Sequence, residues 1–353
     1  MWILHKFFSK MIKIKVWHVI GLIGLIIAAS SYTIHKMEPE TFPTLLEAVW
    51  WTMTTLVTVG YGDYFPTTSA GRIFTMLLLY TFGIGAMGLV IGKIFESFSL
   101  YRKLKEEGKL KYSGKGHYIL IGSSKEKLHN VIEEILSAEK KAEIVVIDNT
   151  DKIPVIHERV HFVSGDPAEE DVLLKANILE TKSVSVFTDE RIDLSEYADG
   201  KTLLIASRVE SISKQSGKSI YTIVEIMKEN HIALFEYANV DEFILSNDSV
   251  SRLMAQAAIH PGSSQLFKQL LSKTDGENLY EIKKKPHWKT YKEAAMELFD
   301  LGAILISDGN HLDIARRPNE QIPENAKMFI ICDEPTYLKI NAQADGSAAV
   351  REL

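Results

Sequence analysis

Two long apolar runs constrain this chain more than any other feature of its sequence. Residues 16–34 contain no Asp, Glu, Lys or Arg, and Tyr80 is the only ionisable side chain within residues 73–92. Each run has roughly the 20 residues that an α-helix needs to cross the hydrocarbon core of a bilayer. The first run is too long for the apolar part of a secretory signal, and no small-residue cleavage pattern follows it. The sequence therefore predicts two membrane-spanning helices.

The basic residues predict the orientation of these helices. They flank the pair on both outer sides, as Lys6, Lys10, Lys13 and Lys15 before the first run and Arg102, Lys103, Lys105, Lys109 and Lys111 after the second. Between the two runs, only Lys36 and Arg72 are basic. By the positive-inside rule, we expect a multi-pass protein of the plasma membrane with both termini in the cytoplasm.

Composition excludes several other classes of protein. The chain has 353 residues, a net charge of −6 and a pI near 6.0, so nothing suggests a nucleic-acid partner. Cys332 is the only cysteine, which rules out an intramolecular disulfide. No nucleophile–base constellation is evident in the soluble part, so we expect no catalytic residue and no enzyme.

A short apolar segment lies between the two runs. Residues 44–57 are too few to span a bilayer, and Pro43 is suited to the first position of a helix capped near Thr41 or Phe42. We expect a re-entrant helix that ends just before TVGYGD, residues 58–63. Irregular backbone at membrane depth persists only where it is buried in protein or lines a water-filled path. The segment 58–63 is therefore expected to line a pore.

The residue types in this segment suit a cation path. Gly60 and Gly62 can adopt positive φ angles without a Cβ penalty, and they alternate with Val59 and Tyr61. Such alternation lets successive carbonyl groups point toward one axis, and Thr58 adds a hydroxyl oxygen at the inner end. Four copies of the segment would surround a K⁺ ion and replace its hydration shell. The sequence thus predicts a homotetrameric pore with K⁺ as the permeant ion.

Residues 50–66, WWTMTTLVTVGYGDYFP, resemble the pore helix and selectivity filter of potassium channels. The resemblance implies that the filter consists of Thr58, Val59, Gly60, Tyr61 and Gly62. It also implies supporting roles: Trp50 and Trp51 as an aromatic cuff beside Tyr61, and Asp63 as the residue behind the filter that bonds to the cuff. Anchoring at the membrane interface is the alternative role for the two tryptophans. Thr54 stands where some relatives carry a glutamate.

Glycines interrupt the second apolar run at Gly83, Gly85, Gly88 and Gly92. A glycine costs roughly 1 kcal/mol in a helix interior, so this density requires a reason. Close packing against neighbouring helices is one. A hinge for pore opening at Gly83, Gly85 and Gly88 is the other, and two-helix potassium channels suggest it.

Beyond residue 113, short apolar strands alternate with amphipathic helices. Strands are predicted at 117–122, 143–148, 159–166, 183–189, 219–226 and 242–246, with helices at 128–135, 169–176, 196–213 and 231–238. This order predicts a doubly wound parallel sheet. Two helices broken at Pro261-Gly262 follow, and then a small α+β lobe with strands at 278–283, 302–309, 311–316 and 326–333 and a helix at 290–301.

This order resembles an RCK domain, the module that regulates potassium channels, over about 115–340. The matching motifs are Gly122 after the first strand, Gly165-Asp166-Pro167 after the third, and the trailing lobe. The expected organisation is a pore domain (1–98), a gating linker (99–115), a Rossmann-like lobe (116–247), crossover helices for dimerisation (248–274), a C-terminal lobe (275–340) and a disordered tail (341–353). The resemblance implies a ring of RCK domains, which extra soluble RCK chains could complete to an octamer.

The sequence is compatible with two kinds of regulatory ligand for the RCK ring, a divalent cation and an adenine nucleotide. Asp189 and Glu225 end two successive strands, and Glu190 and Asp193 are nearby. The resemblance to calcium-gated channels implies that these residues bind a regulatory Ca²⁺. At the position of the family's third carboxylate, this chain has Met227. An adenine nucleotide (ADP, ATP or NAD(H)) is the alternative, near Gly122, Asp148 and Asp166, although two of three fingerprint glycines are missing. A solvated acidic face needs no ligand at all. We expect a ligand-gated potassium channel whose RCK ring binds a divalent cation such as Ca²⁺, with the adenine nucleotide as the alternative ligand; a non-conducting regulatory subunit is the remote alternative.

Overall fold

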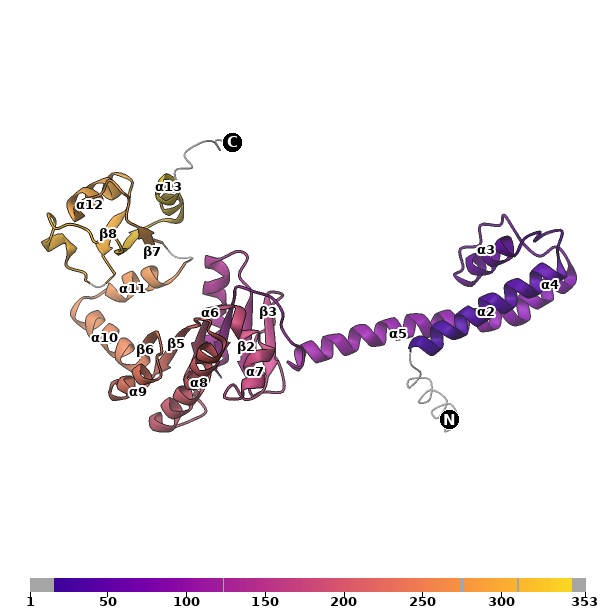
Figure 1. Cartoon of the computed structure of the whole chain (residues 1–353), viewed down its shortest axis with the longest axis horizontal. Coiled ribbons are helices and arrows are strands. Elements are labelled where there is room, and N and C mark those ends of the chain that lie inside the picture. The colour runs from indigo at the N-terminus through magenta and orange to yellow at the C-terminus, as the bar shows by residue number, and fades with distance from the viewer. Residues whose placement is uncertain (1–15, 123, 274–275, 310, 345–353) are drawn as a thin grey trace. The chain divides into compact units, whose positions relative to one another are not determined.

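The computed structural model describes residues 16–122, 124–273, 276–309 and 311–344 (Figure 1). The chain divides into two compact units, Met1–Leu104 and Lys105–Leu353. The lysines at 6–15, whose cytoplasmic location is predicted, and the part of the predicted tail from residue 345 onward lie outside the described residues.

The first unit is helical. It contains α2 (Val16–Met37), α3 (Leu45–Leu56), α4 (Ser69–Phe74), the π-helical segment η1 (Thr75–Tyr80) and the beginning of α5 (Thr81–Glu106). By length and composition, Trp17–Met37 and the continuous helical run Ser69–Glu106 can each cross a membrane, and most of their side chains are not buried within this chain. Exposed apolar surface along helices of this length suits a lipid or subunit environment better than the interior of a soluble domain.

Helix α3 begins later than the proline suggests. Its N-cap is Thr44, whose side chain accepts a hydrogen bond from the Glu47 amide, while the Glu47 carboxylate accepts one from the Thr44 amide. This capping box satisfies two donors reciprocally, which a helix starting at Pro43 would not achieve, so the expected cap at Thr41 or Phe42 is wrong. A small apolar core holds α3 against α2 and η1. It consists of Ile34, Phe42, Ala48, Trp51, Leu56 and Leu79.

The second unit contains the predicted parallel sheet. Its strands are β1 (His117–Ile121), β2 (Ile144–Asp148), β3 (Val160–Ser164), β4 (Thr181–Val186), β5 (Tyr221–Ile226) and β6 (Glu242–Leu245), in the order β3-β2-β1-β4-β5-β6. All pairs are parallel, and the chain order reverses between β1 and β4. In open sheets of this kind, ligands bind at the carboxyl ends of the strands near such a switch point.

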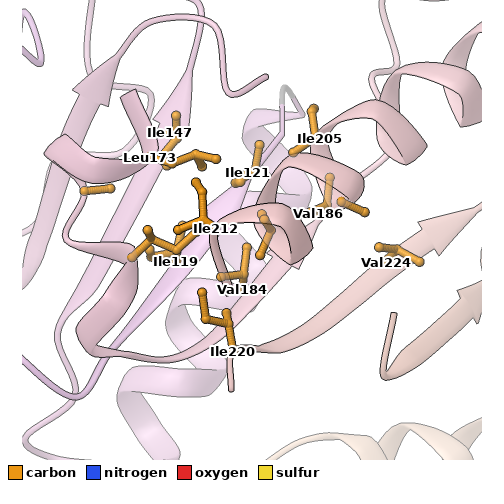
Figure 2. Close-up of a cluster of buried hydrophobic side chains, with 14 of the residues drawn as sticks. Ile119, Ile121, Ile147, Leu173, Val184, Val186, Ile205, Ile212, Ile220 and Val224 are labelled. Carbon is orange, nitrogen blue, oxygen red and sulfur yellow. The ribbon is translucent and has the colours of Figure 1, made fainter. Parts of the chain in front are cut away.

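Both faces of the sheet are covered by helices. On one face, Ile119, Ile121, Val184 and Val186 pack with α7 (Glu170–Lys175) and α8 (Ser195–Ser216), as Figure 2 shows for Leu173, Ile205 and Ile212. On the other face, Leu120, Ile144 and Phe162 pack with α6 (Lys125–Ala138). Alternate residues of a strand point to opposite faces, so the continuous apolar strands are accounted for by this double layer.

The 3₁₀ turn η3 (Glu229–His231) and helix α9 (Ile232–Tyr237) connect β5 to β6, and Phe235 of α9 is buried in the core of the parallel sheet. The crossover consists of α10 (Ser246–Ile259) and α11 (Ser263–Leu271). The small lobe contains the antiparallel strands β7 (Asn278–Lys283), β9 (Lys327–Cys332) and β8 (Ile304–Ser307), in that order across the sheet, together with α12 (Tyr291–Asp300) and α13 (Glu334–Ala344).

Two predictions for the C-terminal lobe are wrong. Residues 311–316 form no strand; they lead into the 3₁₀ turn η4 (Ile314–Arg316), because Asp308 accepts a hydrogen bond from the His311 amide and turns the chain away from the sheet. Residues 341–344 are helical, as the end of α13, and not part of a disordered tail.

Candidate functional site

The segment 58–63 has the irregular backbone that its glycines predict. Gly60 and Gly62 have φ angles of 55° and 77°, which confirms the expectation of positive φ, and Thr58 has a φ of 64°. The strained Thr58 was not predicted, because only glycine reaches this region without a steric cost. The amides of Val59 and Gly60 both donate to the Thr54 carbonyl, at 2.8 and 3.1 Å. These two amides are thereby satisfied within one chain.

Trp50 and Trp51 have different surroundings, although the sequence pairs them. The Trp50 ring stacks on Tyr61 with centroids 5.7 Å apart and an interplanar angle of 3°. Its indole Nε1 donates to Oδ2 of Asp63 at 2.7 Å, and Oδ1 of Asp63 accepts from the Tyr64 amide. The Trp51 ring is buried and lies 5.2 Å from Phe42. Of the two tryptophans, Trp50 is therefore the one that contacts Tyr61 and Asp63, whereas Trp51 packs against Phe42.

Glu38 is a residue of this site that the sequence interpretation missed. Its buried carboxylate accepts four hydrogen bonds, from the backbone amides and side-chain hydroxyls of Thr67 and Thr68, over 2.6–3.2 Å. The C-terminal end of α2, which Glu38 follows directly, is thereby fixed to Thr67 and Thr68 just before α4. A Cβ atom on Gly71 would lie 2.1 Å from Glu38 Oε1, so this glycine leaves space for the carboxylate. The signal in the sequence is the acid at the end of the first apolar run.

The candidate hinge glycines all lie within α5. A Cβ at Gly83 would make ordinary contact with Leu56 at 3.5 Å, and Gly85 and Gly88 have nothing within 4 Å. Close packing inside one protomer therefore does not require them. The π-helical segment η1 lies immediately before them; π-segments often mark functional positions in helices. The hinge stays a prediction.

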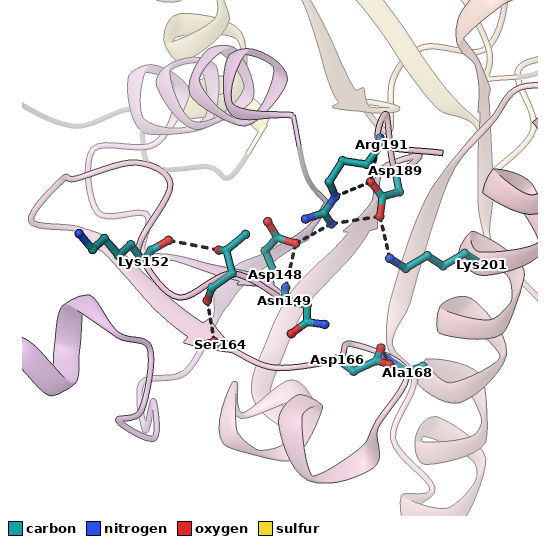
Figure 3. A network of polar contacts seen from close by, with 10 residues as sticks. Asp148, Asn149, Lys152, Ser164, Asp166, Ala168, Asp189, Arg191 and Lys201 are labelled. Carbon is teal, nitrogen blue, oxygen red and sulfur yellow. Dashed lines mark hydrogen bonds and ion pairs between the residues drawn. The ribbon is translucent and has the colours of Figure 1, made fainter. Parts of the chain in front are cut away.

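The carboxylates predicted at the sheet edge are neutralised by basic side chains. Asp189 is buried, and its oxygens pair with Arg191 Nε at 2.8 Å and Lys201 Nζ at 2.7 Å (Figure 3). Arg191 also reaches Asp148 Oδ1, at 3.1 Å. Buried carboxylates need such partners, because an isolated charge away from water is costly.

Glu225 is neutralised in the same way on the neighbouring strand. Its Oε1 pairs with Lys127 Nζ at 2.8 Å, and its Oε2 accepts from the Thr188 amide at 3.0 Å. Lys127 also pairs with Glu190, at 3.0 Å. Although burial lowers the pKa of Lys127, its hydrogen bonds to the two glutamates raise it overall. Lys127 therefore stays charged at physiological pH.

These pairs change the interpretation of the acidic cluster. Among the described residues, no three His, Cys, Asp or Glu side chains come together as metal ligands, and Asp193 is exposed. Three cations, Lys127, Arg191 and Lys201, stand among the predicted carboxylates. The sequence analysis anticipated none of these pairs: Arg191 is close to Asp189 in the sequence, but Lys127 and Lys201 meet their carboxylates only through the fold.

The residues predicted to hold a nucleotide are partly assembled. Gly122, Asp148, Asp189 and Arg191 line one pocket at the carboxyl ends of β1, β2 and β4. The free volume there is ≈ 20 Å³, enough for about one water, so a larger ligand would have to displace side chains. Asp166 does not line this pocket; its exposed carboxylate accepts from the Ala168 amide in the turn before α7.

One zinc-type spacing does occur, at His157-Glu158-x-x-His161. The motif places both imidazoles on one face only when it is helical. Here it runs from a loop into β3; His157 Nδ1 accepts from the Arg159 amide, and His161 Nε2 donates to the Leu110 carbonyl. The two histidines are not a metal pair.

Comparisons with known proteins agree with this division of the chain. A family model for ion channels matches residues 17–99, and a TrkA-N domain model matches residues 119–246. YugO of Bacillus subtilis, which is named as a potassium channel protein, is 30% identical over 244 residues, covering 68% of this chain and 72% of YugO. The calcium-gated potassium channel TvoK of Thermoplasma volcanium is 28% identical over 262 residues, covering 73% of each chain.

Among solved structures, the GsuK channel bound to ADP shares 16% identity, with a TM-score of 0.41. The match covers 65% of this chain and 60% of the GsuK chain. The ion-channel and TrkA-N matches together place the chain in the class of membrane ion channels that carry a regulatory domain. The chain belongs to the prokaryotic potassium channels that join a two-helix pore to a TrkA-N (RCK) domain.

Proposed function

We propose that this protein is a K⁺-selective channel of the plasma membrane, with both termini in the cytoplasm, regulated by a nucleotide at the carboxyl edge of its parallel sheet. The alternation of positive φ at Thr58, Gly60 and Gly62 with Val59 and Tyr61 supports the K⁺ path. Four such segments are needed to enclose an ion, so the pore is a homotetramer.

The ligand assignment rests on the cations around the pocket. Arg191 and Lys201 can exchange their bonds with Asp189 for bonds to phosphate, and guanidinium groups bind phosphate in a bidentate manner. Asp148 ends β2, where a carboxylate is suited to ribose hydroxyls. A Ca²⁺ ion would instead have to displace three cations from Asp189 and Glu225, and among the described residues no third carboxylate comes together with these two to complete its oxygen ligands. The nucleotide is therefore preferred over the divalent cation that the sequence favours.

The crossover helices support the assembly of a ring. Neither α10 nor α11 buries a side chain within this chain. Their exposed apolar residues are Val250, Met254, Ile259, Leu266, Phe267 and Leu271. Helices α10 and α11 pair with those of a second RCK domain. A tetrameric pore supplies four such domains, and extra soluble RCK chains would complete an octameric ring. The ligand shifts the pore only if it binds the open ring more tightly than the closed one.

Flux through reconstituted channels tests the proposal. Purified protein in vesicles should take up Rb⁺, block with Ba²⁺, and respond to ADP, ATP or NADH on the cytosolic side. Arg191→Gln and Lys201→Gln should each shift the nucleotide dose–response by about tenfold or more, since each removes a charged phosphate contact. Lys140→Gln, an exposed lysine away from the pocket, is the matched control. An unchanged dose–response in both variants would reject the nucleotide site.

Calcium is the second candidate. Its support is the similarity to TvoK and the presence of Asp189 and Glu225 at two strand ends. A response to Ca²⁺ that Asp189→Asn abolishes, without any response to nucleotides, would favour it. Absence of Rb⁺ flux under every condition would revive the non-conducting regulatory subunit.

A further inference from the structure

The segment 106–116, which we call the strap, lies along the sheet of the second unit and is bonded to it. It follows directly from helix α5 and leads into β1. Its backbone bonds are Ile153 N to Glu106 O, Ser164 N to Gly108 O, Tyr112 N to Lys175 O, and Gly116 N to Glu180 O, all within 2.7–3.0 Å. Asn177 Nδ2 adds a bond to Gly114 O at 2.7 Å. The strap is part of the sheet domain and not a free tether.

Tyr112 is the side chain that holds the middle of the strap. Its ring lies between two imidazoles, with centroids 4.5 Å from His117 and 5.3 Å from His161. Its hydroxyl donates to the Glu143 carboxylate. Burial first, and then this hydrogen bond, raise the pKa of Tyr112, which keeps the hydroxyl protonated as a donor.

Each imidazole forms one hydrogen bond through Nε2 to a backbone carbonyl. His117 is fully buried, and its Nε2 donates to the Ala176 carbonyl at 2.9 Å. Its Nδ1 is buried without a partner among the described residues. His161 Nε2 donates to the Leu110 carbonyl of the strap at 3.1 Å. A proton on Nδ1 of His117 would create a buried donor with no acceptor, which is costly.

We infer that His117 and His161 form a proton-sensitive lock on the strap, which releases it from the sheet when the cytosol becomes acidic. This inference concerns how the ligand-gated channel proposed above transmits force, and it rests on that function. A released strap lengthens the connection between sheet and inner helix, so that movement of the ring no longer reaches the pore.

The charged groups around the rings have opposing effects. Burial is the largest influence and lowers the pKa of both histidines. The carboxylate of Glu143 favours the protonated form of both rings. The ammonium of Lys105 opposes protonation of His161, and His161 opposes protonation of His117. The docked strap therefore binds fewer protons than the released one. Docking is strongest above pH of about 6.5 and weakens as pH falls below it.

Proteolysis of the full channel measures release directly. Lys109 and Lys111 are exposed trypsin sites, but cleavage within a docked strap requires local release. The measured quantity is the rate of cleavage at Lys109 and Lys111 divided by the rate at Lys140 in the same molecule. This ratio should rise when the pH is lowered from 8 to 6. The rise should be up to about fourfold for each histidine whose pKa returns to about 6.5 when the strap is released. A flat ratio in the wild-type channel overturns the inference, whatever the channel does with nucleotides.

Two variants separate the lock from general acid sensitivity. Glutamine can donate to the same carbonyls but does not titrate, so His117→Gln and His161→Gln should each flatten part of the profile. His129→Gln, an exposed histidine paired with Glu133, should leave the profile unchanged. Single-channel records at cytosolic pH 8 and 6 should show a wild-type loss of ligand-evoked opening that His161→Gln reduces. A wild-type pH profile in His161→Gln contradicts the lock, even if His117→Gln does not fold.

Discussion

The indole Nε1 of Trp50 donates to the Asp63 carboxylate at 2.7 Å, and this bond joins the helix before the filter to the residue that follows it. Because the Trp50 ring also stacks on Tyr61, one side chain contacts the segment 58–63 at both Tyr61 and Asp63. The two contacts can be separated, since phenylalanine keeps an aromatic face but has no N–H group.

The Trp50–Asp63 bond should appear as a coupling energy between the two residues. A hydrogen bond to a charged acceptor contributes about 1.5–3 kcal/mol, and partial exposure places this one at the lower end. We expect Trp50→Phe and Asp63→Ala to be non-additive by about 1–2 kcal/mol in the equilibrium between conducting and non-conducting filters, measured in single-channel records. If Trp50→Phe has the same effect with and without Asp63, the bond does not control that equilibrium.

Replacing Glu38 by glutamine, its closest isostere, should destabilise the channel. Glutamine keeps one acceptor oxygen, but it directs an NH₂ group toward donors of Thr67 or Thr68, which now lose their partner. We expect Glu38→Gln to lower the stability of the channel by about 2 kcal/mol, measured by heat-induced loss of the assembled channel in detergent. Glu40 is exposed two residues away, so Glu40→Gln should behave as wild type.

The C-terminal lobe should lose stability in strong acid at one identifiable cluster. The Glu297 carboxylate accepts from Lys285 Nζ at 2.9 Å, His287 Nε2 at 2.6 Å and Trp288 Nε1 at 2.7 Å. Burial raises its pKa, but these three hydrogen bonds outweigh burial and lower the pKa to about 2. The folded lobe therefore binds fewer protons than the unfolded one. The stability from Glu297 is complete above about pH 4.5 and is lost as pH falls toward about 2.

Tryptophan fluorescence can follow this transition when the signal of the buried Trp288 is isolated by comparison with Trp288→Phe, since the chain has five tryptophans. In Glu297→Gln, the lobe should be less stable at pH 7 and should show less change between pH 4.5 and 2. An acid profile that is the same in the variant would assign the loss to other carboxylates.

Local chemistry determines how much of this molecule was predictable. Gly60 and Gly62 were predictable because only glycine enters positive φ cheaply, and the sheet was predictable because its apolar strands alternate with helices. The division of roles between Trp50 and Trp51 was not, because adjacent helical residues point in different directions.

The ligand edge was the least predictable part. Asp189 and Glu225 could be placed at strand ends from the sequence, but their charge balance depends on Lys127 and Lys201, which reach them from two different helices. Side chains that meet only through tertiary structure leave no spacing in the sequence. For the same reason, Glu38 and the two threonines that bind it gave no motif.

Gly108 and Gly116 lie near the two ends of the strap. Gly108 and Gly116 have φ angles of 63° and 66°, so alanine at either position carries a similar conformational cost of about 1 kcal/mol. They differ in their surroundings. A Cβ at Gly108 would lie 2.3 Å from the Ser164 amide nitrogen and 2.7 Å from the Phe162 ring, whereas a Cβ at Gly116 meets nothing within 4 Å. Gly108→Ala should therefore push the strap off the sheet, and Gly116→Ala should only strain its own backbone.

We expect Gly108→Ala to expose Lys109 and Lys111 to trypsin at pH 8 and to reduce ligand-evoked opening, with ligand binding to the sheet edge unchanged. Gly116→Ala should show little of either effect, since the strap can stay docked. Equal cleavage and equal opening in the two variants would mean that the close approach of Gly108 to β3 does not hold the strap. A loss of binding together with opening would instead indicate that the substitution disturbs the sheet itself, because Ser164 and Phe162 belong to β3.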